Sequence, residues 1–211
     1  MLSSWYDSDL AYEAQVTEWI AHLTHGPATR MLAGFALKLH SGGVAVSLGR
    51  KLLQLVGPGI PDIYQGTEFF DFSLVDPDNR RFVDYAARSA AAGSPEDVAK
   101  QRVVREALAL RRERPQLFLD GGYAGVFAEG DARQHVVGMA RTADDVPQVI
   151  ALATREPLAL KRDGGWRGTV VTLPDGIWTD CFSGRKHFGR VPMAELCAEL
   201  PVALLSLSLI H

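Results

Sequence analysis

The chain changes character near residue 115, and this change limits the folds that it can adopt. Before that point, apolar residues recur at the spacing of one-faced helices, as at Trp19 and Leu23. From Leu117 onward, short β-rich runs follow one another at intervals of about 8 to 15 residues, and Gly, Asp or Pro bounds each run. We therefore predict an α+β chain in which a helical part, residues 1–115, precedes an antiparallel β-sandwich, residues 116–211.

Glycine and proline divide the helical part. They predict one helix that ends at Gly26-Pro27, a second that ends at Gly42-Gly43 and a third that ends at Gly57-Pro58. The third helix carries its apolar residues on one face: Leu48, Leu52, Leu55 and Val56. A short strand, Ile60–Tyr64, is predicted next because the run is partly β-branched and flanked by proline.

The signals are sharper after residue 90. Ser94-Pro95-Glu96-Asp97 supplies an N-cap, a proline at the first helical position and acidic residues in the first turn, and basic residues precede Pro115. A helix from Ser94 to Arg114 is therefore predicted, and a short helix is expected within 193–200. The predicted strands are 123–127, 134–141, 148–154, 168–173, 177–180 and 202–206.

Composition excludes several classes of protein. The formal net charge of -3 offers no field to hold a phosphate backbone or an anionic membrane. No uninterrupted apolar run approaches the length of a membrane span, and no signal peptide is recognised at the N-terminus. The two cysteines, Cys181 and Cys197, lack a metal or redox spacing and are interpreted as free thiols of a cytoplasmic protein.

One segment could carry chemistry, because carboxylates, an amide and guanidinium groups are interleaved there with aromatic rings. Its polar residues are Asp62, Asp71, Asp76, Asp78, Asn79, Arg80, Arg81 and Asp84. Such polar groups give the directional hydrogen bonds that sugar hydroxyls require, and aromatic faces pack on the C–H faces of a pyranose. The alternative is that these residues pair with one another and with backbone amides to hold a long loop.

Other chemistries are poorly supported. Asp76 and Asp78 supply two oxygen ligands, but the glycine and closing glutamate of a calcium loop are missing, so no metal site is predicted. The sequence contains no nucleophile elbow, no glycine-rich phosphate loop with lysine and no dinucleotide fingerprint. We therefore predict no cofactor, and two neighbouring aspartates in a loop make poor candidates for an opposed acid and nucleophile.

The same segment carries a family resemblance. The string Pro58-Gly-Ile-Pro-Asp-Ile-Tyr-Gln-Gly-Thr-Glu68 resembles the eighth barrel strand of the α-amylase superfamily. Together with Leu74-Val-Asp-Pro-Asp-Asn-Arg-Arg81 and Val83-Asp-Tyr85, it is similar to the maltooligosyltrehalose synthases in particular. The resemblance implies that residues 1–115 are the last part of a (β/α)8 barrel and that the chain is the C-terminal part of such an enzyme.

The resemblance also implies where the chemistry lies. The catalytic carboxylates of the superfamily precede the part that this chain matches, so we assign no catalytic residue and expect the isolated chain to be inactive. Active sites of such barrels lie at the C-terminal ends of the strands, which makes this segment part of the pocket for a maltooligosaccharide. The candidate substrate-binding residues are Tyr64, Gln65, Asp76, Asp78, Asn79, Arg80 and Arg81.

Two expectations concern partners. An incomplete barrel would leave apolar helix faces uncovered at Trp19, Phe35 and Leu52, so self-association is expected. The competing hypothesis is a separate carbohydrate-binding or interaction module that presents aromatic residues of the β-rich part to glycan. Its candidate residues are Tyr123, Trp166 and Trp178.

Overall fold

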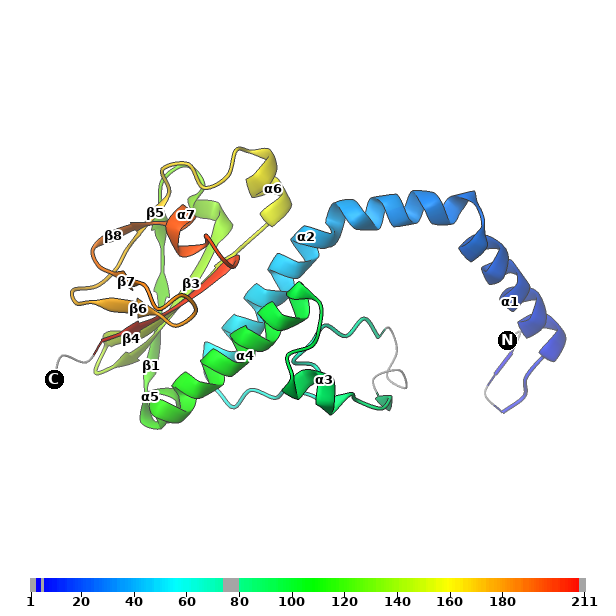
Figure 1. Ribbon diagram of the computed structural model, residues 1–211, viewed down its shortest axis with the longest axis horizontal. Coiled ribbons are helices and arrows are strands. Elements are labelled where there is room, and N and C mark those ends of the chain that lie inside the picture. Colours follow the sequence, from blue (N-terminus) through cyan, green and yellow to red (C-terminus); the bar gives the residue numbers. More distant parts are fainter. Residues whose placement is uncertain (1–2, 5, 74–79, 209–211) are drawn as a thin grey trace. The chain divides into compact units, whose positions relative to one another are not determined.

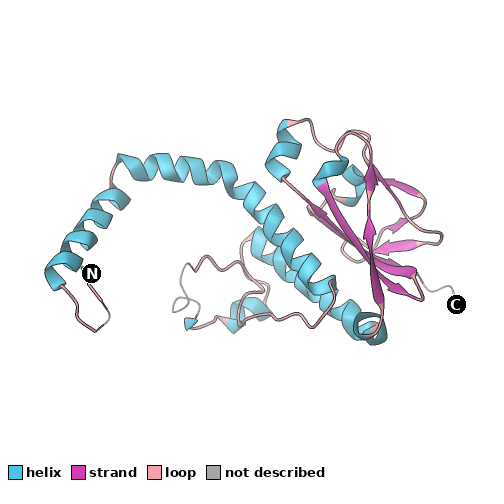
Figure 2. Ribbon diagram, turned by 180° about the vertical axis from the view of Figure 1, so that it is seen from behind, coloured by secondary structure: helices cyan, strands magenta, loops and turns pink. Residues whose placement is uncertain are grey.

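The structure is a computed structural model that describes residues 3–4, 6–73 and 80–208 (Figure 1). The chain divides into two compact units, residues 1–41 and residues 42–211. The predicted domain boundary at residue 115 falls inside the second unit, and it stays a prediction. Figure 2 shows that strands are confined to the C-terminal part and that helices dominate before it. Mixed helix and sheet with antiparallel pairing is therefore confirmed.

The elements have the following bounds. The helices are α1 (Leu10–His25), α2 (Pro27–Val56), α3 (Tyr85–Ser89), α4 (Pro95–Glu113), α5 (Pro115–Leu119), α6 (Pro157–Arg162) and α7 (Met193–Leu196), with a 3-10 turn η2 (Arg133–His135). The strands are β1 (Gly122–Val126), β2 (Ala128–Glu129), β3 (Val136–Ala143), β4 (Val146–Thr154), β5 (Val170–Thr172), β6 (Trp178–Asp180), β7 (Lys186–His187), β8 (Arg190–Pro192) and β9 (Val202–Leu207).

The break predicted at Gly42-Gly43 is wrong, because α2 runs unbroken from Pro27 to Val56. Glycine in a helix costs only about 1 kcal/mol, which packing can offset. Gly42 is buried, and a Cβ atom there would lie 2.7 Å from Cγ of Leu158. The glycine therefore allows α6 to approach α2 rather than ending the helix.

The length of α2 also corrects the statement about apolar runs. An 18-residue window of this helix has a mean hydropathy of 1.3, so α2 is long and apolar enough to cross a membrane by length and composition. Glycine, serine and a lysine interrupt the run, and counting uninterrupted residues overlooked it. Such a single helix is weak evidence for a membrane span, because core helices of soluble proteins pass the same test.

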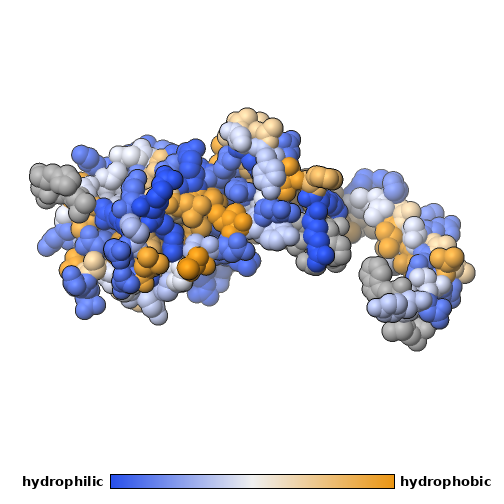
Figure 3. All heavy atoms as spheres, turned by 90° about the horizontal axis from the view of Figure 1, so that it is seen from below, coloured by the Kyte–Doolittle hydropathy of each residue, from blue (hydrophilic) through white to orange (hydrophobic). Residues whose placement is uncertain are grey.

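Unit 1 buries little of its apolar surface. Asp9 caps α1 by accepting hydrogen bonds from the N–H groups of Ala11 (3.1 Å) and Tyr12 (3.0 Å), yet no residue of α1 is buried. Trp19 is 62% exposed and Phe35 is 60% exposed, as expected for unpartnered helix faces. The orange surfaces on the rightmost part of Figure 3 mark apolar residues of this unit.

Unit 2 contains a six-stranded sheet and a three-stranded sheet, with all strand pairs antiparallel. The strand order is β1-β3-β4-β9-β6-β7 in the larger sheet and β2-β5-β8 in the smaller one. Ile150 on β4 and Leu205 on β9 are paired in register, and both are buried. They contact Val171 and Val191 of the smaller sheet in one apolar cluster, so the two sheets share a core.

The opposite face of the larger sheet is covered by helices. Val149, Ala151 and Ala153 of β4 belong to a second apolar cluster, which also contains residues of α2, α4 and α5. A Cβ atom at Gly49 would lie 3.1 Å from Cβ of Ala153, so the backbone of α2 lies close to the sheet. Since β4 is buried on both faces, its run from Val149 to Ala153 is continuously apolar instead of alternating.

The helix face predicted from Leu48, Leu52, Leu55 and Val56 is confirmed, and all four residues are buried. Leu52 was expected to lack a covering surface in this chain, and that expectation is wrong. Its side chain is 0% exposed, because the larger sheet and α4 cover this half of α2. Of the three residues expected to be uncovered, Trp19 and Phe35 keep the expected exposure.

The predicted strand at Ile60–Tyr64 is wrong. These residues form no strand, and Ile60 is 88% exposed. A strand requires a hydrogen-bonded neighbour, and the described residues provide none for this run. Ile63 does pack at the edge of the cluster that contains α2, which holds the segment in place.

Candidate functional site

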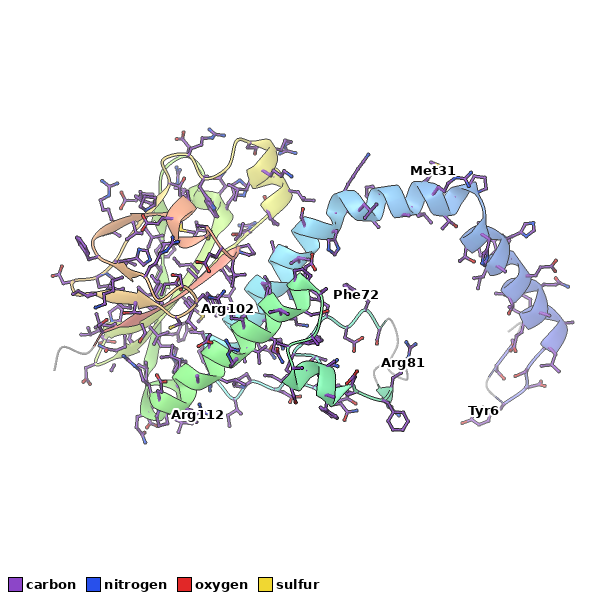
Figure 4. The ribbon with its side chains drawn as sticks, viewed as in Figure 1. Tyr6, Met31, Phe72, Arg81, Arg102 and Arg112 are labelled. Atoms are coloured by element: carbon purple, nitrogen blue, oxygen red, sulfur yellow. The ribbon has the colours of Figure 1, made fainter. Side chains whose placement is uncertain are left out.

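The polar and aromatic segment identified in the sequence lies in unit 2, between α2 and α4. It ends at Asp84, directly before α3, and its described residues form two arms, 62–73 and 80–84. Figure 4 labels Phe72 on the first arm and Arg81 on the second. The predicted residues within the described part of the chain are Tyr64, Gln65, Arg80 and Arg81. Those that lie outside the described residues are Asp76, Asp78 and Asn79.

A hollow of about 160 Å³ opens on this segment. Two predicted residues, Gln65 and Arg81, line it together with Gly66 and Arg88. The remaining lining residues are Phe70, Asp71, Ser73, Phe82 and Val83. The structure therefore brings two of the predicted residues to one cavity, whereas the described lining does not include Tyr64 or Arg80.

A tight turn at Gly66 forms one side of the hollow. The carbonyl of Tyr64 accepts hydrogen bonds from the N–H (2.9 Å) and Oγ1 (2.7 Å) of Thr67. Gly66 has a φ of 80°, which side chains disfavour, and a Cβ atom there would lie 2.8 Å from Cγ1 of Val83. Only glycine therefore permits both the turn and the close approach of Val83.

Arg88 joins the two arms of the segment. Its Nε and Nη2 donate to the carbonyl oxygen of Gly66 at 3.0 and 2.8 Å, and its Nη1 donates to the carbonyl oxygen of Asp84 at 3.0 Å. The guanidinium carbon also lies 4.9 Å from the centre of the Phe69 ring. The bonds have good geometry and are assisted by the charge of the guanidinium.

Two residues of helix α4 form hydrogen bonds with the backbone of the segment. Ser94 is the predicted N-cap and forms a capping box with Asp97, and Oδ1 of Asp97 also accepts a hydrogen bond from the N–H of Phe70 at 2.7 Å. Nζ of Lys100, which is 7% exposed, donates to the carbonyl oxygen of Phe69 at 2.7 Å. Both residues hold the backbone of the segment, which supports a bracing role for these charges.

The two charged groups of α4 have shifted pKa values. Burial opposes ionisation of Asp97, but hydrogen bonds from Phe70 and Ser94 and the charge of Lys100 outweigh it, so the pKa of Asp97 is lowered. Burial also lowers the pKa of Lys100, with a further contribution from the charge of Lys51. Asp97 is therefore ionised at neutral pH, where its carboxylate accepts the hydrogen bond from the N–H of Phe70.

The lowered pKa of Asp97 predicts an acid-sensitive contribution to stability. This contribution is complete above the ordinary aspartate pKa and is lost as the pH falls through the lowered folded-state value. Below about pH 4, the parent chain should therefore lose more free energy of unfolding per pH step than the Asp97→Asn variant. Urea unfolding at several pH values measures this difference, and parallel pH curves would contradict the prediction.

The lining of the hollow suits binding better than catalysis. Its carboxylate, Asp71, accepts hydrogen bonds from the Oγ and N–H of Ser73, which lower its pKa although burial opposes them. A general acid requires a raised pKa, so Asp71 does not fit that role. The lining also contains the Phe70 ring and the donors of Gln65 and Arg81. The Phe70 ring is stacked on that of Phe72, which lies outside the lining, with centres 5.9 Å apart. These are groups that hold a sugar.

Two other features are less suited to this chemistry. A larger hollow of about 730 Å³ lies along α2, but its described lining includes Arg50, Lys51 and Lys100 and no carboxylate or aromatic ring. Burial raises the pKa of the Cys181 and Cys197 thiols to about 12 each, so neither is a nucleophile at neutral pH. Among the described residues, no group of three or more His, Cys, Asp or Glu could hold a metal ion.

Sequence reasoning missed the residues that brace the segment. Arg88, Lys100 and Gln101 were not singled out, and Asp97 was identified only as part of a helix cap. Gln101 donates to the carbonyl oxygen of Arg88 at 2.6 Å, which links α4 to α3. The capping signal at Ser94 could locate the start of α4, but no local signal shows that Lys100 reaches back to Phe69.

Comparison with known proteins identifies relatives of this chain. No family model matches it. A protein of Mycobacterium tuberculosis named "Putative maltooligosyl trehalose synthase" is 44% identical over 203 residues, which is 96% of this chain and 26% of that protein. The solved structure of maltooligosyltrehalose synthase from Arthrobacter ramosus is 40% identical with a TM-score of 0.86, and the match covers 98% of this chain and 28% of that one. The resemblance to the maltooligosyltrehalose synthases is confirmed.

Over nearly all of its length, this chain is therefore similar to a part of the maltooligosyltrehalose synthases. It spans about a quarter of the length of the relatives that it matches. A more distant solved structure, titled "Crystal Structure of Maltooligosyl trehalose synthase", is 23% identical with a TM-score of 0.71 and shows likeness of fold. The match covers both units of the chain, so the exposed helices of unit 1 are part of it.

Proposed function

We propose that this chain contributes one wall of the sugar pocket in a cytoplasmic maltooligosyltrehalose synthase. In such an enzyme, the reducing-end α-1,4 link of a maltooligosaccharide becomes an α,α-1,1 trehalose link by intramolecular transfer. The observation that carries the proposal is the 40% identity and TM-score of 0.86 to the A. ramosus enzyme over 98% of the chain. The hollow lined by Gln65 and Arg81 is the place where this wall meets sugar.

The wall has a chemical task in this reaction. A released glucose must turn and attack again before water replaces it, so the pocket has to hold glucose and exclude water. Gln65 and Arg81 supply hydrogen-bond donors, and Phe70 supplies an apolar face. We keep Tyr64, Asp76, Asp78, Asn79 and Arg80 as proposed substrate-binding residues of the same wall.

The remaining proposals concern the rest of the enzyme. Helices α2 and α4 are proposed to be the last helices of a (β/α)8 barrel, with the catalytic carboxylates on a part of the enzyme that this chain lacks. Without that part, the apolar faces at Trp19 and Phe35 are proposed to drive self-association of the isolated chain.

The alternative of a separate glycan-binding module loses one of its candidate residues. Trp178 is 0% exposed and donates from Nε1 to the carbonyl oxygen of Pro174 at 2.8 Å.

The test is incubation with maltopentaose of three proteins: the complete synthase that contains this chain, its Arg81→Ala variant and the chain alone. We expect the complete enzyme to form a non-reducing product and the chain alone to form none. Loss of the Arg81 donor should raise hydrolysis relative to transfer about tenfold, because a well-placed charged hydrogen bond contributes about 1.5 to 3 kcal/mol.

The matched control is Arg112→Ala, since Arg112 lies exposed near the C-terminal end of α4, and Figure 4 shows it away from the loop that carries Arg81. Its ratio of hydrolysis to transfer should equal that of the parent. Formation of non-reducing product by the chain alone would overturn the proposal that the catalytic groups lie elsewhere. Only reducing sugars from the complete enzyme would overturn the proposed reaction.

A further inference from the structure

The segment that lines the hollow is held at both ends by one side chain. Gly66 precedes residues 67–83 and Asp84 follows them, and the guanidinium of Arg88 bonds to the backbone carbonyls of both residues. Arg88 lies on α3, directly after the segment that it closes. The connection is therefore made by a residue whose own backbone is positioned by the end of the same loop.

Few other residues could make this connection. A guanidinium is planar and projects several N–H groups in fixed directions, so three of its nitrogens can reach Gly66 and Asp84 together. A lysine ammonium at the same place is a single point, and it cannot span two carbonyls in this geometry. The side chain of Arg88 is 21% exposed, so water competes only weakly for these bonds.

The backbone of Gly66 lies close to Val83 and to Arg88, which leaves no room for a side chain. A Cβ atom at Gly66 would lie 2.8 Å from Cγ1 of Val83 and 3.1 Å from Nη2 of Arg88. Gly66, Val83 and Arg88 all line the hollow, and they come from its two arms and from α3. Both arms and α3 therefore meet at this point of the hollow.

We infer that Arg88 is a positioning residue that fixes the separation of the two walls of the sugar-facing hollow, and this inference rests on the proposed function. Arg88 acts through its neighbours, because Gln65 precedes the clamped Gly66 and Arg81 lies on the arm that ends at Asp84. While Arg88 bonds to both carbonyls, the distance between the donor groups of Gln65 and Arg81 stays constant. When these bonds are lost, the two arms separate, and water can replace the released glucose before it attacks again.

The experiment uses the complete synthase that contains this chain and measures hydrolysis and transfer on maltopentaose. Arg88→Lys keeps the positive charge but loses the planar arrangement of N–H donors. Arg88→Ala removes both the charge and the donors. We expect each variant to raise the ratio of hydrolysis to transfer about five- to tenfold, mainly through a lower kcat for transfer, with the KM for maltopentaose within about twofold. Adding ethylguanidinium to Arg88→Ala should restore much of the parental ratio of hydrolysis to transfer, because it supplies the missing guanidinium group.

The matched control is Arg105→Lys. Arg105 is also an arginine of this helical region, but its side chain is 66% exposed and bonds to the adjacent Glu106. Its ratio should equal that of the parent. A parental ratio in Arg88→Lys, or a fall in both reactions by the same factor, would overturn the inference, since charge alone or general stability would then explain Arg88.

The inference and the proposed function fail in different ways. If the parent enzyme makes no non-reducing product, the proposed function fails before Arg88 is tested. If the parent makes that product and the Arg88 variants keep its ratio, only the inference on Arg88 fails. Thermal unfolding of each variant, with a midpoint within a few degrees of the parent, identifies the folded samples, and Arg88→Lys carries the test if Arg88→Ala does not fold.

Discussion

Replacing Arg141 by Met is expected to lower the free energy of unfolding by about 3–5 kcal/mol. Arg141 on β3 is 2% exposed, and its Nη2 lies within hydrogen-bond distance of the carbonyl oxygens of Leu117 (3.0 Å), Phe118 (3.2 Å) and Gly121 (2.8 Å). These carbonyls belong to α5 and the turn into β1. Without the guanidinium they stay buried and unpaired, and each then costs its desolvation.

A methionine fills similar volume, so the expected loss measures the polar contacts rather than a cavity. The control is Arg155→Met, because the side chain of Arg155 is 61% exposed and its ion pair is with the adjacent Glu156 at 3.5 Å. That change should cost less than about 1 kcal/mol. Urea unfolding followed by circular dichroism gives both values. Equal values for the two variants would show that water replaces the bonds of Arg141.

Replacing Leu52 by Ala is expected to cost about 3–4 kcal/mol, because the substitution leaves a cavity between α2, α4 and the larger sheet. Leu52 is 0% exposed and lies in the same apolar cluster as Val104 and Ala151. The neighbouring Leu53 is only partly buried, so Leu53→Ala should cost clearly less. Denaturant unfolding compares the pair, and equal losses would mean that this half of α2 does not pack on the sheet.

Elements with strong local signals were predicted well. The helix expected from Ser94 to Arg114 is present as α4, with Ser94 as its N-cap, because capping box and proline act within a few residues. The long strands β3, β4 and β9 lie close to their predicted positions, since β-rich runs bounded by turn residues favour strands. The two-residue strands β2 and β7 were missed because so short a run has no readable period.

The errors came from tertiary packing. The local sequence at Gly42-Gly43 predicts a helix end, but Leu158 fills the space beside Gly42 and the helix continues. Ile60–Tyr64 read as a strand, yet a strand depends on a neighbour that the described chain does not provide.

The candidate site shows the same division between local and distant information. Sequence patterns located the polar segment and identified Gln65 and Arg81 among residues that could bind sugar. They did not show that Lys100 reaches Phe69 or that Arg88 reaches Gly66, because those contacts connect residues 31 and 22 positions apart. The bracing residues are ordinary charged residues of helices, which are usually solvated.

The place of β9 in the larger sheet has a consequence for how the protein is made. β9 is the last strand of the described chain, yet it lies between β4 and β6 and pairs with both. On the ribosome, β4 emerges long before β9, so the edge of β4 that pairs with β9 stays open until Val202–Leu207 has been translated. A premature stop codon before Val202 would thus leave an open edge that nascent chains can share, and quality-control proteases would remove such products.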